Sequence, residues 1–156
     1  MTTRTPPKGI ARWFMRMPIT FYKIGLGGLM GGRFLLLNHT GRKSGLPRQV
    51  VLEVVKHEPM TDIYTVASGF GSTSDWYRNL QSRPDVTIQV RRRKMAVRAH
   101  FLTQSEGGEV MMDYARRYPK AARALSKTLN YPVGEGKPED YRRVGEGIPF
   151  VAFRPQ

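Results

Sequence analysis

The alternation of apolar and polar side chains through the middle of the chain predicts a β-rich domain. Short runs with this period, bounded by Gly, Pro, Asn or Asp, are typical of strands. Most connections between the runs are short, and strands joined in this way favour an antiparallel sheet that closes, or nearly closes, into a barrel. The six predicted strands are Arg33–His39, Gln49–Lys56, Ile63–Ser68, Asp85–Arg91, Met95–Leu102 and Ile148–Phe153.

Helical signals flank the strands. Thr103 and Glu106 have the spacing of a capping box, in which each side chain bonds the other residue's backbone N–H. Proline is well tolerated in the first turn of a helix, so Pro119 permits a helix start. Residues 130–147 are rich in Gly and Pro and are expected to be irregular. The helices predicted in this domain are Ser74–Ser82, Glu109–Tyr118 and Pro119–Leu129.

The N-terminal residues 1–32 are expected to stand apart from a barrel domain over residues 33–156. A helix over residues 8–24 would carry one apolar stripe, because large apolar side chains recur at i, i+3, i+4 and i+7. This stripe either packs on the core or a partner subunit, or lies on an anionic membrane surface. Gly25–Gly32, which follows, would be a linker or a loop close to a ligand. The stripe consists of Ile10, Trp13, Phe14 and Met17.

The charge of the chain narrows the classes of partner. Lys and Arg number 26 while Asp and Glu number 12, which gives a formal net charge of +14. A chain this basic attracts nucleic acid, anionic lipid or a polyanionic small ligand. The basic residues are scattered apart from the run Arg91–Lys94, so charge alone does not choose among the three.

Several kinds of site and location are not expected. The chain has no cysteine, which excludes disulfides, cysteine-ligated metals and thiol catalysis. Its three histidines form no HxxxH or HExxH pair, so no metal site is expected. No apolar stretch reaches the roughly 20 residues of a spanning helix, and the N-terminus lacks the apolar segment of a signal peptide. A cytoplasmic location is expected, at the inner face of the membrane if the N-terminal helix binds lipid.

The turn between the first two predicted strands, Thr40–Gly45, carries residues suited to bind an anion. With the strand residues that follow, its sequence is TGRKSG-x-x-R. A glycine at each end of the RKS run allows a positive φ and brings backbone N–H groups close to a ligand. Arginine offers a fork of donors that matches phosphate or carboxylate, and lysine adds a compact charge. A solvated basic hairpin turn is the alternative. The candidate anion ligands are Arg42, Lys43, Ser44 and Arg48.

Two later segments could complete a site for a planar ring. Small residues at Ala67–Gly71, after the third strand, would let a ring lie against the backbone; an ordinary loop is the alternative. On the next helix Trp76 and Asn79 share a face. Trp76 could instead belong to the core, and Asn79 to the surface. No Ser-His-Asp or paired-carboxylate arrangement is visible, so hydrolysis is not expected.

Three motifs occur in an order and at a spacing that resemble those of a known family. They are LLNHTGRKSG-x-PR, YTVASGFG and DWYRNL-x-x-xPDVTIQV. Over about residues 33–104 the chain resembles the deazaflavin-dependent nitroreductases, within the flavin and deazaflavin oxidoreductases. The resemblance implies an α+β, mainly β fold: a split β-barrel, as in FMN-binding proteins, of about six antiparallel strands with flanking helices. It implies coenzyme F420, a deazaflavin with a phosphate and a polyglutamate tail, as cofactor.

The resemblance also implies which residues form the site. The turn would bind the acidic tail, and the strand Gln49–Glu53 would run beside the deazaflavin. Apart from the resemblance, Ser68 or Tyr118 is the candidate donor for stabilising the charge that develops on the acceptor, and solvent could instead provide the proton. The implied cofactor-binding residues are Arg42, Lys43, Ser44, Arg48, Gln49, Val50, Val51, Leu52, Glu53, Val66, Ala67, Ser68, Gly69, Trp76, Tyr77 and Asn79.

The expected activity is reduction of an electrophilic, lipophilic acceptor by F420H2, by hydride transfer from ring carbon C5. Quinones, enones, nitro compounds and fatty acyl chains belong to this class. Nitroimidazole reduction is in doubt, because Glu53 stands where members with that activity have a tyrosine. The expected partner is this small-molecule acceptor; contact of residues 8–24 with a membrane and formation of a homodimer are further options.

Three alternatives stay open. The chain could be an F420 carrier without turnover, or an FMN-dependent oxidoreductase on the same barrel. FMN has a single phosphate, so a turn with this much positive charge favours the longer acidic tail. The third alternative is a basic nucleic-acid-binding barrel, supported by Arg91–Lys94. Nucleic acid is not the expected partner, because the strands lack the aromatic pattern of RNA-binding sheets.

Overall fold

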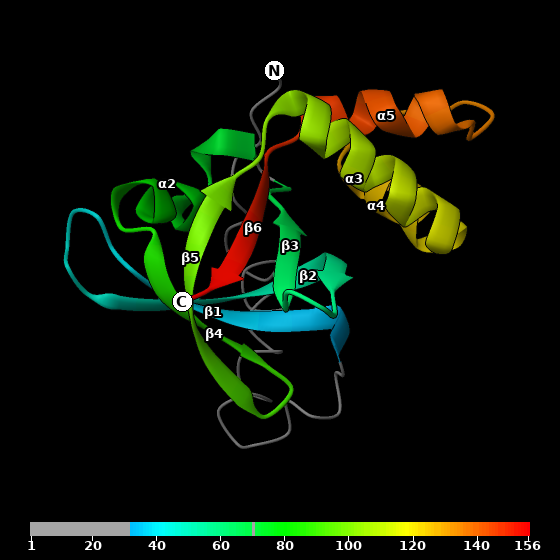
Figure 1. Ribbon diagram of the computed structural model, residues 1–156. Coiled ribbons are helices and arrows are strands. Elements are labelled where there is room, and N and C mark those ends of the chain that lie inside the picture. Colours follow the sequence, from blue (N-terminus) through cyan, green and yellow to red (C-terminus); the bar gives the residue numbers. More distant parts are fainter. Residues whose placement is uncertain (1–31, 70) are drawn as a thin grey trace.

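Six antiparallel strands close into a barrel (Figure 1). The computed structural model describes residues 32–69 and 71–156, so the predicted helix over residues 8–24 lies outside the described residues. The strand order is β1-β2-β3-β6-β5-β4, and each pairing is antiparallel. This confirms the predicted barrel. The strands are β1 Phe34–Thr40, β2 Pro47–Glu58, β3 Ile63–Ala67, β4 Asp85–Val90, β5 Arg93–Phe101 and β6 Phe150–Pro155.

Alternation along each strand turns one set of side chains into the barrel interior. On β2 this inward set includes Val50 and Leu52. Helix α2 (Asp75–Ser82) adds Trp76, Tyr77 and Leu80 to the same core. The rings of Trp76 and Tyr77 meet edge to face, with centroids 5.9 Å apart. We call this set of buried residues the barrel core.

Helices α3 (Gln104–Arg117), α4 (Pro119–Thr128) and α5 (Pro138–Gly147) form a layer beside the barrel (Figure 1). Their buried faces build a second hydrophobic core, the helix core, which includes Val55 of β2. Helices α3 and α5 approach closely: a Cβ on Gly145 would overlap the carbonyl oxygen of Gly107. Within the described residues no helix is long and apolar enough to span a membrane.

Helix α5 corrects the prediction that residues 130–147 are irregular. The segment before it is irregular, but Pro138 occupies the first turn of the helix, where its missing N–H costs nothing. Lys137 is the N-cap, and its N–H donates to Asp140 Oδ2 at 2.9 Å. Buried positions do recur with the spacing of a helix in this segment, but the surrounding glycines led to the prediction of irregular structure. The positions that carry it are Tyr141, Val144, Gly145 and Ile148.

Helix α3 confirms the predicted capping box but begins earlier than expected. Thr103 Oγ1 accepts from the Glu106 N–H at 3.2 Å, and Glu106 Oε2 accepts from the Thr103 N–H at 2.7 Å. The helix therefore starts at Gln104 and not at Glu109. The prediction started it late because glycine is a poor helix former. Here the glycine at 107 is buried against α5 and Phe150, where a side chain would not fit.

Candidate cofactor site

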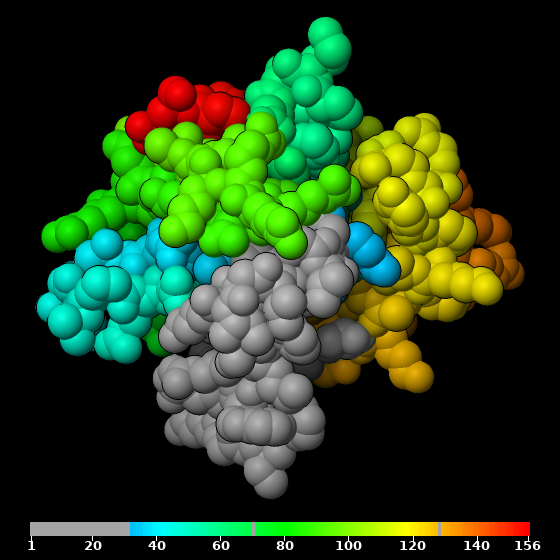
Figure 2. Space-filling model, turned by 90° about the horizontal axis from the view of Figure 1, so that it is seen from below, coloured from blue at the N-terminus to red at the C-terminus, as the bar shows by residue number. Residues whose placement is uncertain are grey.

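The turn that joins β1 to β2 is closed by its own backbone. The Gly41 N–H donates to the Leu46 carbonyl at 2.9 Å, and the Gly45 N–H donates to the Gly41 carbonyl at 2.8 Å. Gly45 has a φ of +70°, which suits glycine. Ser44 Oγ accepts from the Leu46 N–H at 3.2 Å. The turn is therefore preformed, and it projects from the edge of the molecule opposite to α4 and α5 (Figures 1 and 2).

A buried amide on α2 holds the turn in place. Asn79 Oδ1 accepts from the backbone N–H of Arg42 and from its Nη1, both at 3.0 Å. Arg42 Nη1 also lies 3.3 Å from Asp75 Oδ1. Asn79 Nδ2 is therefore left to donate to His39 Nδ1, at 3.0 Å. This order of donors places the imidazole proton on Nε2 of His39. We call His39, Arg42, Asp75 and Asn79 the turn network.

The turn network keeps His39 neutral. Its side chain is buried, and burial lowers the pKa of His39 from 6.5 to about 4. The positive charge of Arg48 lowers this pKa further, while the carboxylate of Asp75 opposes the shift. A protonated imidazole would also lose its acceptor at Nδ1, which the amide of Asn79 requires. The base of the turn thus depends on an uncharged histidine.

Two cations of the turn remain available to a ligand. The side chains of Lys43 and Arg48 are exposed, and neither forms an ion pair or a side-chain hydrogen bond within residues 32–69 and 71–156. Arg42 is committed to the turn network through Nη1 alone, so its Nε and Nη2 keep their donors. Of the four predicted anion ligands, Arg42 and Ser44 take part in the structure of the turn, whereas Lys43 and Arg48 are uncommitted.

The predicted segment Gln49–Glu53 presents its side chains to two different surfaces. Val50 and Leu52 face the barrel core, whereas Gln49 and Glu53 lie on the outer face of β2 together with Val51. Gln49 Nε2 donates there to Asn38 Oδ1 at 2.8 Å. The inward side chains cannot touch a ligand on the outer face. The same holds for three other predicted contact residues whose side chains belong to the barrel core, namely Val66, Trp76 and Tyr77.

Ser68 is placed differently from the prediction of a catalytic hydroxyl. It is fully buried, and its Oγ donates to the Gly71 carbonyl at 2.6 Å and lies 3.1 Å from Ser74 Oγ. These bonds join the end of β3 to the short 3-10 turn Gly71–Thr73 and to Ser74, the N-cap of α2, so we correct the role of Ser68 to a structural one. The neighbours of Ser68 in the sequence contact the helix side of the molecule instead. Ala67 packs on the helix core, and a Cβ on Gly69 would lie 3.1 Å from a Leu129 methyl.

A tyrosine pair stands beside the outer face of β2. Tyr114 on α3 donates its hydroxyl proton to Glu53 Oε1 at 2.8 Å, and Arg33 Nη2 lies 3.8 Å from the same oxygen. Burial and this hydrogen bond raise the pKa of Tyr114 above its ordinary value. The Tyr118 ring lies 5.8 Å from that of Tyr114, centroid to centroid. The side chain of Tyr118 is 54% exposed, and its hydroxyl bonds to no described residue.

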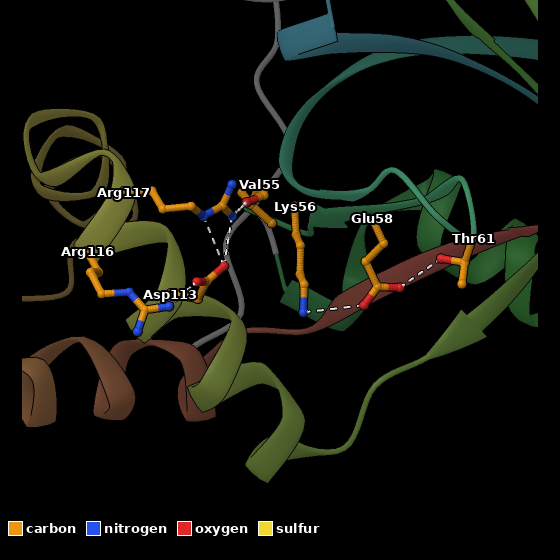
Figure 3. Close-up of polar contacts among 7 residues, drawn as sticks. All are labelled: Val55, Lys56, Glu58, Thr61, Asp113, Arg116 and Arg117. Atoms are coloured by element: carbon orange, nitrogen blue, oxygen red, sulfur yellow. Dashed lines mark hydrogen bonds and ion pairs between the residues drawn. The ribbon is translucent and has the colours of Figure 1, made fainter.

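Arg117 fixes the C-terminal end of α3 to β2 (Figure 3). Its Nη2 donates to the Val55 carbonyl at 3.2 Å, and its Nε donates to Asp113 Oδ2 at 3.0 Å. Arg116 Nη2 bonds the other oxygen of Asp113 at 2.6 Å. The Arg117 guanidinium carbon also lies 5.5 Å from the centroid of the Tyr118 ring. These contacts hold the tyrosine pair beside β2.

His39 and Tyr114 were not among the residues predicted from the sequence to form the site. His39 and Asn79 are 40 positions apart, and Glu53 and Tyr114 are 61 apart, so no local motif links either pair. One signal was present for the first pair. His39 follows the inward alternation of the strand that contains Leu37, and a buried polar side chain requires a hydrogen-bond partner.

The arrangement is compatible with an elongated anionic cofactor such as F420. Lys43 and Arg48 offer uncommitted positive charge to an acidic tail. At about 3.3 Å per residue, β2 extends about 17 Å from Arg48 to Glu53. The outer face of β2 runs from the basic turn to the tyrosine pair, whereas Arg48, which pairs with the inward-facing His39, extends from the opposite face at the start of the strand. A tail at the turn and a ring system near Glu53 would engage the start and the middle of β2.

Solved structures share this fold. An F420-H2 dependent reductase (FDR-A) is 21% identical with a TM-score of 0.52, and the match covers 78% of this chain and 94% of that chain. A second structure, described as a domain-swapped dimer, is 18% identical with a TM-score of 0.55, covering 94% of this chain and 100% of that chain. At these identities the likeness shows the fold alone, and it confirms the split-barrel class.

Sequence relatives identify the family. The family model described as F420H(2)-dependent quinone reductase matches residues 15–133. A protein of Mycobacterium tuberculosis (strain ATCC 25618 / H37Rv), provisionally described as an F420H(2)-dependent quinone reductase, is 35% identical over 124 residues, which cover 78% of this chain and 89% of the relative. These matches confirm the predicted oxidoreductase class and the F420 cofactor. The chain belongs to the F420H(2)-dependent quinone reductase family.

Proposed function

We propose that the protein reduces a quinone-type acceptor with F420H2, and that the basic turn holds the cofactor tail. When bound, reduced F420 supplies a hydride from its ring carbon C5. The chain's own residues would bind and orient the reactants and handle protons. The observation that carries the proposal is the pair of uncommitted cations, Lys43 and Arg48, on a turn that is already ordered.

The tail grip follows from the chemistry of these side chains. Hydrogen bonds to charged groups contribute roughly 1.5–3 kcal/mol each. Lys43 and Arg48 together would therefore change the affinity for an anionic tail by about a hundredfold or more. Because Asn79 and the turn backbone already order this loop, little ordering cost remains for binding to overcome.

The tyrosine pair would act on the acceptor side. Negative charge develops on a quinone oxygen as it accepts a hydride, and a nearby donor stabilises that charge. We assign this role to Tyr118, whose hydroxyl is accessible and unbonded among the described residues. The raised pKa of Tyr114 keeps its hydroxyl protonated even in alkaline solution, and its proton is directed at Glu53. Tyr114 therefore positions the neighbouring ring.

Titration with F420 beside FMN tests the cofactor grip. Replacing Lys43 and Arg48 together by alanine should weaken F420 binding by about a hundredfold or more. A matched control removes two exposed charges from another turn by Arg92→Ala with Lys94→Ala, and should change affinity by less than about twofold. Equal losses of F420 affinity in both double variants would show that binding depends on the net charge of the protein and not on these two side chains. Tight FMN binding without a response to F420 would reject the cofactor assignment.

An F420 carrier without turnover is the second candidate, because binding residues alone are shared by carriers and enzymes. Oxidation of F420H2 by the soluble quinone menadione separates the two. The proposal expects menadione-dependent oxidation that falls about tenfold or more in Tyr118→Phe, the range typical of losing a proton donor. Binding without any oxidation would favour the carrier.

We further propose that residues 8–24 bring the enzyme to a membrane, where lipophilic quinones reside. The support is the apolar stripe with Trp13 and Phe14, together with a net charge of +14. Flotation with anionic liposomes, with and without residues 1–24, tests this. Equal flotation of both forms would remove the idea.

We also propose that the chain forms a homodimer. The support is a protein of the same fold that is described as a domain-swapped dimer. Sedimentation velocity over a range of concentrations tests the proposal. A single monomeric species at all concentrations would reject it.

A further inference from the structure

A cavity separate from the candidate cofactor site opens between α3, α4 and the segment before α5. It measures about 560 Å³ and is lined by Met112, Lys120, Arg123 and Tyr141 among others. We call it the helix pocket. It lies on the face of α3 that carries positions 109, 112, 113 and 116, nearly opposite to Tyr114 on a helical projection. Figure 2 shows α4 and α5, in yellow and orange, far from the cyan turn.

The floor of the helix pocket is apolar. Met112 and Ala115 contribute from α3, Pro119 from the start of α4 and Pro138 from the start of α5. The ring of Tyr141 adds an aromatic surface. A cavity of this size with an apolar floor and a few polar groups is typical of a small-molecule site. The ligand would therefore have an apolar body.

The charges that remain uncompensated around the pocket are positive. The carboxylate of Asp113 is paired with Arg116 at 2.6 Å, and Glu109 is paired with Arg142 at 2.7 Å. Lys120 and Arg123 also line the pocket, and neither has an acidic partner within the described residues. Two free cations beside an apolar floor complement a ligand that is negatively charged at one end.

Tyr141 aims an unused hydroxyl into the pocket. The residue is only 4% exposed, yet its hydroxyl forms no hydrogen bond with a described residue. Every buried side-chain polar atom of the described residues has a partner, so this hydroxyl must be accessible from the cavity that Tyr141 lines. A Cβ built on Gly136 would lie 2.6 Å from Arg123 Nη2 and 3.7 Å from Tyr141 Oη. The free hydroxyl and the free guanidinium thus converge on one spot.

We propose that the helix pocket binds a small amphiphilic carboxylate. The carboxylate would lie between Lys120 and Arg123 and accept a hydrogen bond from the Tyr141 hydroxyl. Its aryl or short alkyl body would lie on Met112 and the Tyr141 ring. This site is independent of the cofactor grip, because it shares no residue with the turn network; it adjoins the tyrosine pair through Asp113 and Arg116, which line the pocket.

Calorimetric titration of the full chain with 1-naphthoate tests the proposal, with F420 present at saturation. The neutral analogue 1-naphthalenemethanol should bind at least tenfold more weakly, and inorganic phosphate should bind at least tenfold more weakly as well. Equal binding of the alcohol would show that charge is irrelevant. Equal binding of phosphate would show a simple anion site. Either result, or no binding of 1-naphthoate, overturns the proposal.

Substitutions in and near the helix pocket test whether 1-naphthoate binds there. Lys120→Ala and Arg123→Ala should each weaken 1-naphthoate about tenfold, and Tyr141→Phe, which keeps the ring, about threefold to fivefold. Lys127→Ala is the matched control, because Lys127 is exposed on the same helix and does not line the pocket. If Lys120→Ala and Lys127→Ala have the same effect, the ligand binds elsewhere and the proposal fails.

Discussion

His39 should make the stability of the fold fall in mild acid. In the native protein burial lowers the pKa of His39 to about 4, whereas an unfolded chain titrates near 6.5. As the pH falls below about 6.5, His39 becomes protonated in the unfolded chain but stays neutral in the native protein. The linkage relation then requires the free energy of unfolding to decrease. The loss should begin near pH 6.5 and be complete near pH 4.

The expected size of this effect is large. A pKa difference of this magnitude corresponds to about 3 kcal/mol. Single domains are stable by only about 5–15 kcal/mol in total. The imidazole is buried with its Nδ1 already accepting from Asn79, so protonation must break that bond as well as charge a buried ring. Little relief is available without opening the turn network.

Urea unfolding followed by tryptophan fluorescence measures the loss, because Trp76 lies in the barrel core. The wild type and His39→Asn would be compared from about pH 7 to about pH 4. Asparagine keeps an acceptor oxygen for Asn79 but cannot titrate. Subtracting the two curves removes the contribution of every other ionisable group, including the carboxylates. The difference should reach about 3 kcal/mol at the acid end.

Two results would refute this reasoning. Parallel curves for the wild type and His39→Asn would mean that the histidine titrates alike in both states. Direct titration by NMR gives the second check, since the chain has only three histidines to assign. A native pKa of His39 near 6.5 would show that the ring is neither desolvated nor tied to Asn79.

Three further substitutions test other contacts. Gly145→Ala should lower the free energy of unfolding by about 3 kcal/mol, because the new methyl group would overlap the α3 backbone. The control Glu146→Ala, on the exposed side of α5, should change it by less than about 0.5 kcal/mol. Equal effects of the two substitutions in urea unfolding would contradict the close approach of α3 and α5. Tyr114→Phe should cost about 1–2 kcal/mol by removing the bond to the β2 carboxylate, and no loss would mean that this bond is not formed. Arg42→Ala should lower both stability and F420 affinity, but Lys43→Ala affinity alone, as paired melting and binding assays would show.

The strands and their hairpins were predictable because their signals are local. Alternation marks each strand, the turn at Thr40–Gly45 falls where the glycines stand, and the turn at 91–92 falls in the basic run between two alternating segments. Barrel closure depends on β6, which pairs with β3 and β5 although it is far away in the chain. No local pattern specifies that pairing. Helix α5 was missed for a related reason: Gly145 is a poor helix former alone and becomes favourable only against Gly107 of α3.

The residues of the candidate site also divide into those predictable from local sequence and those whose role depends on tertiary contacts. The basic turn was predictable from its glycines and charges, and Asn79 from its place one turn after Trp76. Sequence reasoning did not separate the committed Arg42 from the uncommitted Lys43, because the distinction depends on α2 lying against the turn. Sequence reasoning also assigned Ser68 to catalysis. The burial of its hydroxyl depends on tertiary contacts, which the sequence of a glycine-rich loop does not reveal.

The two hydrophobic cores separate two tasks that evolution can adjust independently. The turn network is fastened to the barrel core through α2, whereas Tyr118 and its neighbours depend on the helix core. A substitution that reshapes α4 therefore need not loosen the cofactor grip. Such modularity would let one barrel acquire new acceptors by drift in its helices. On the proposed acceptor role of Tyr118, α3 to α5 form the part of the chain to randomise when a different acceptor is wanted.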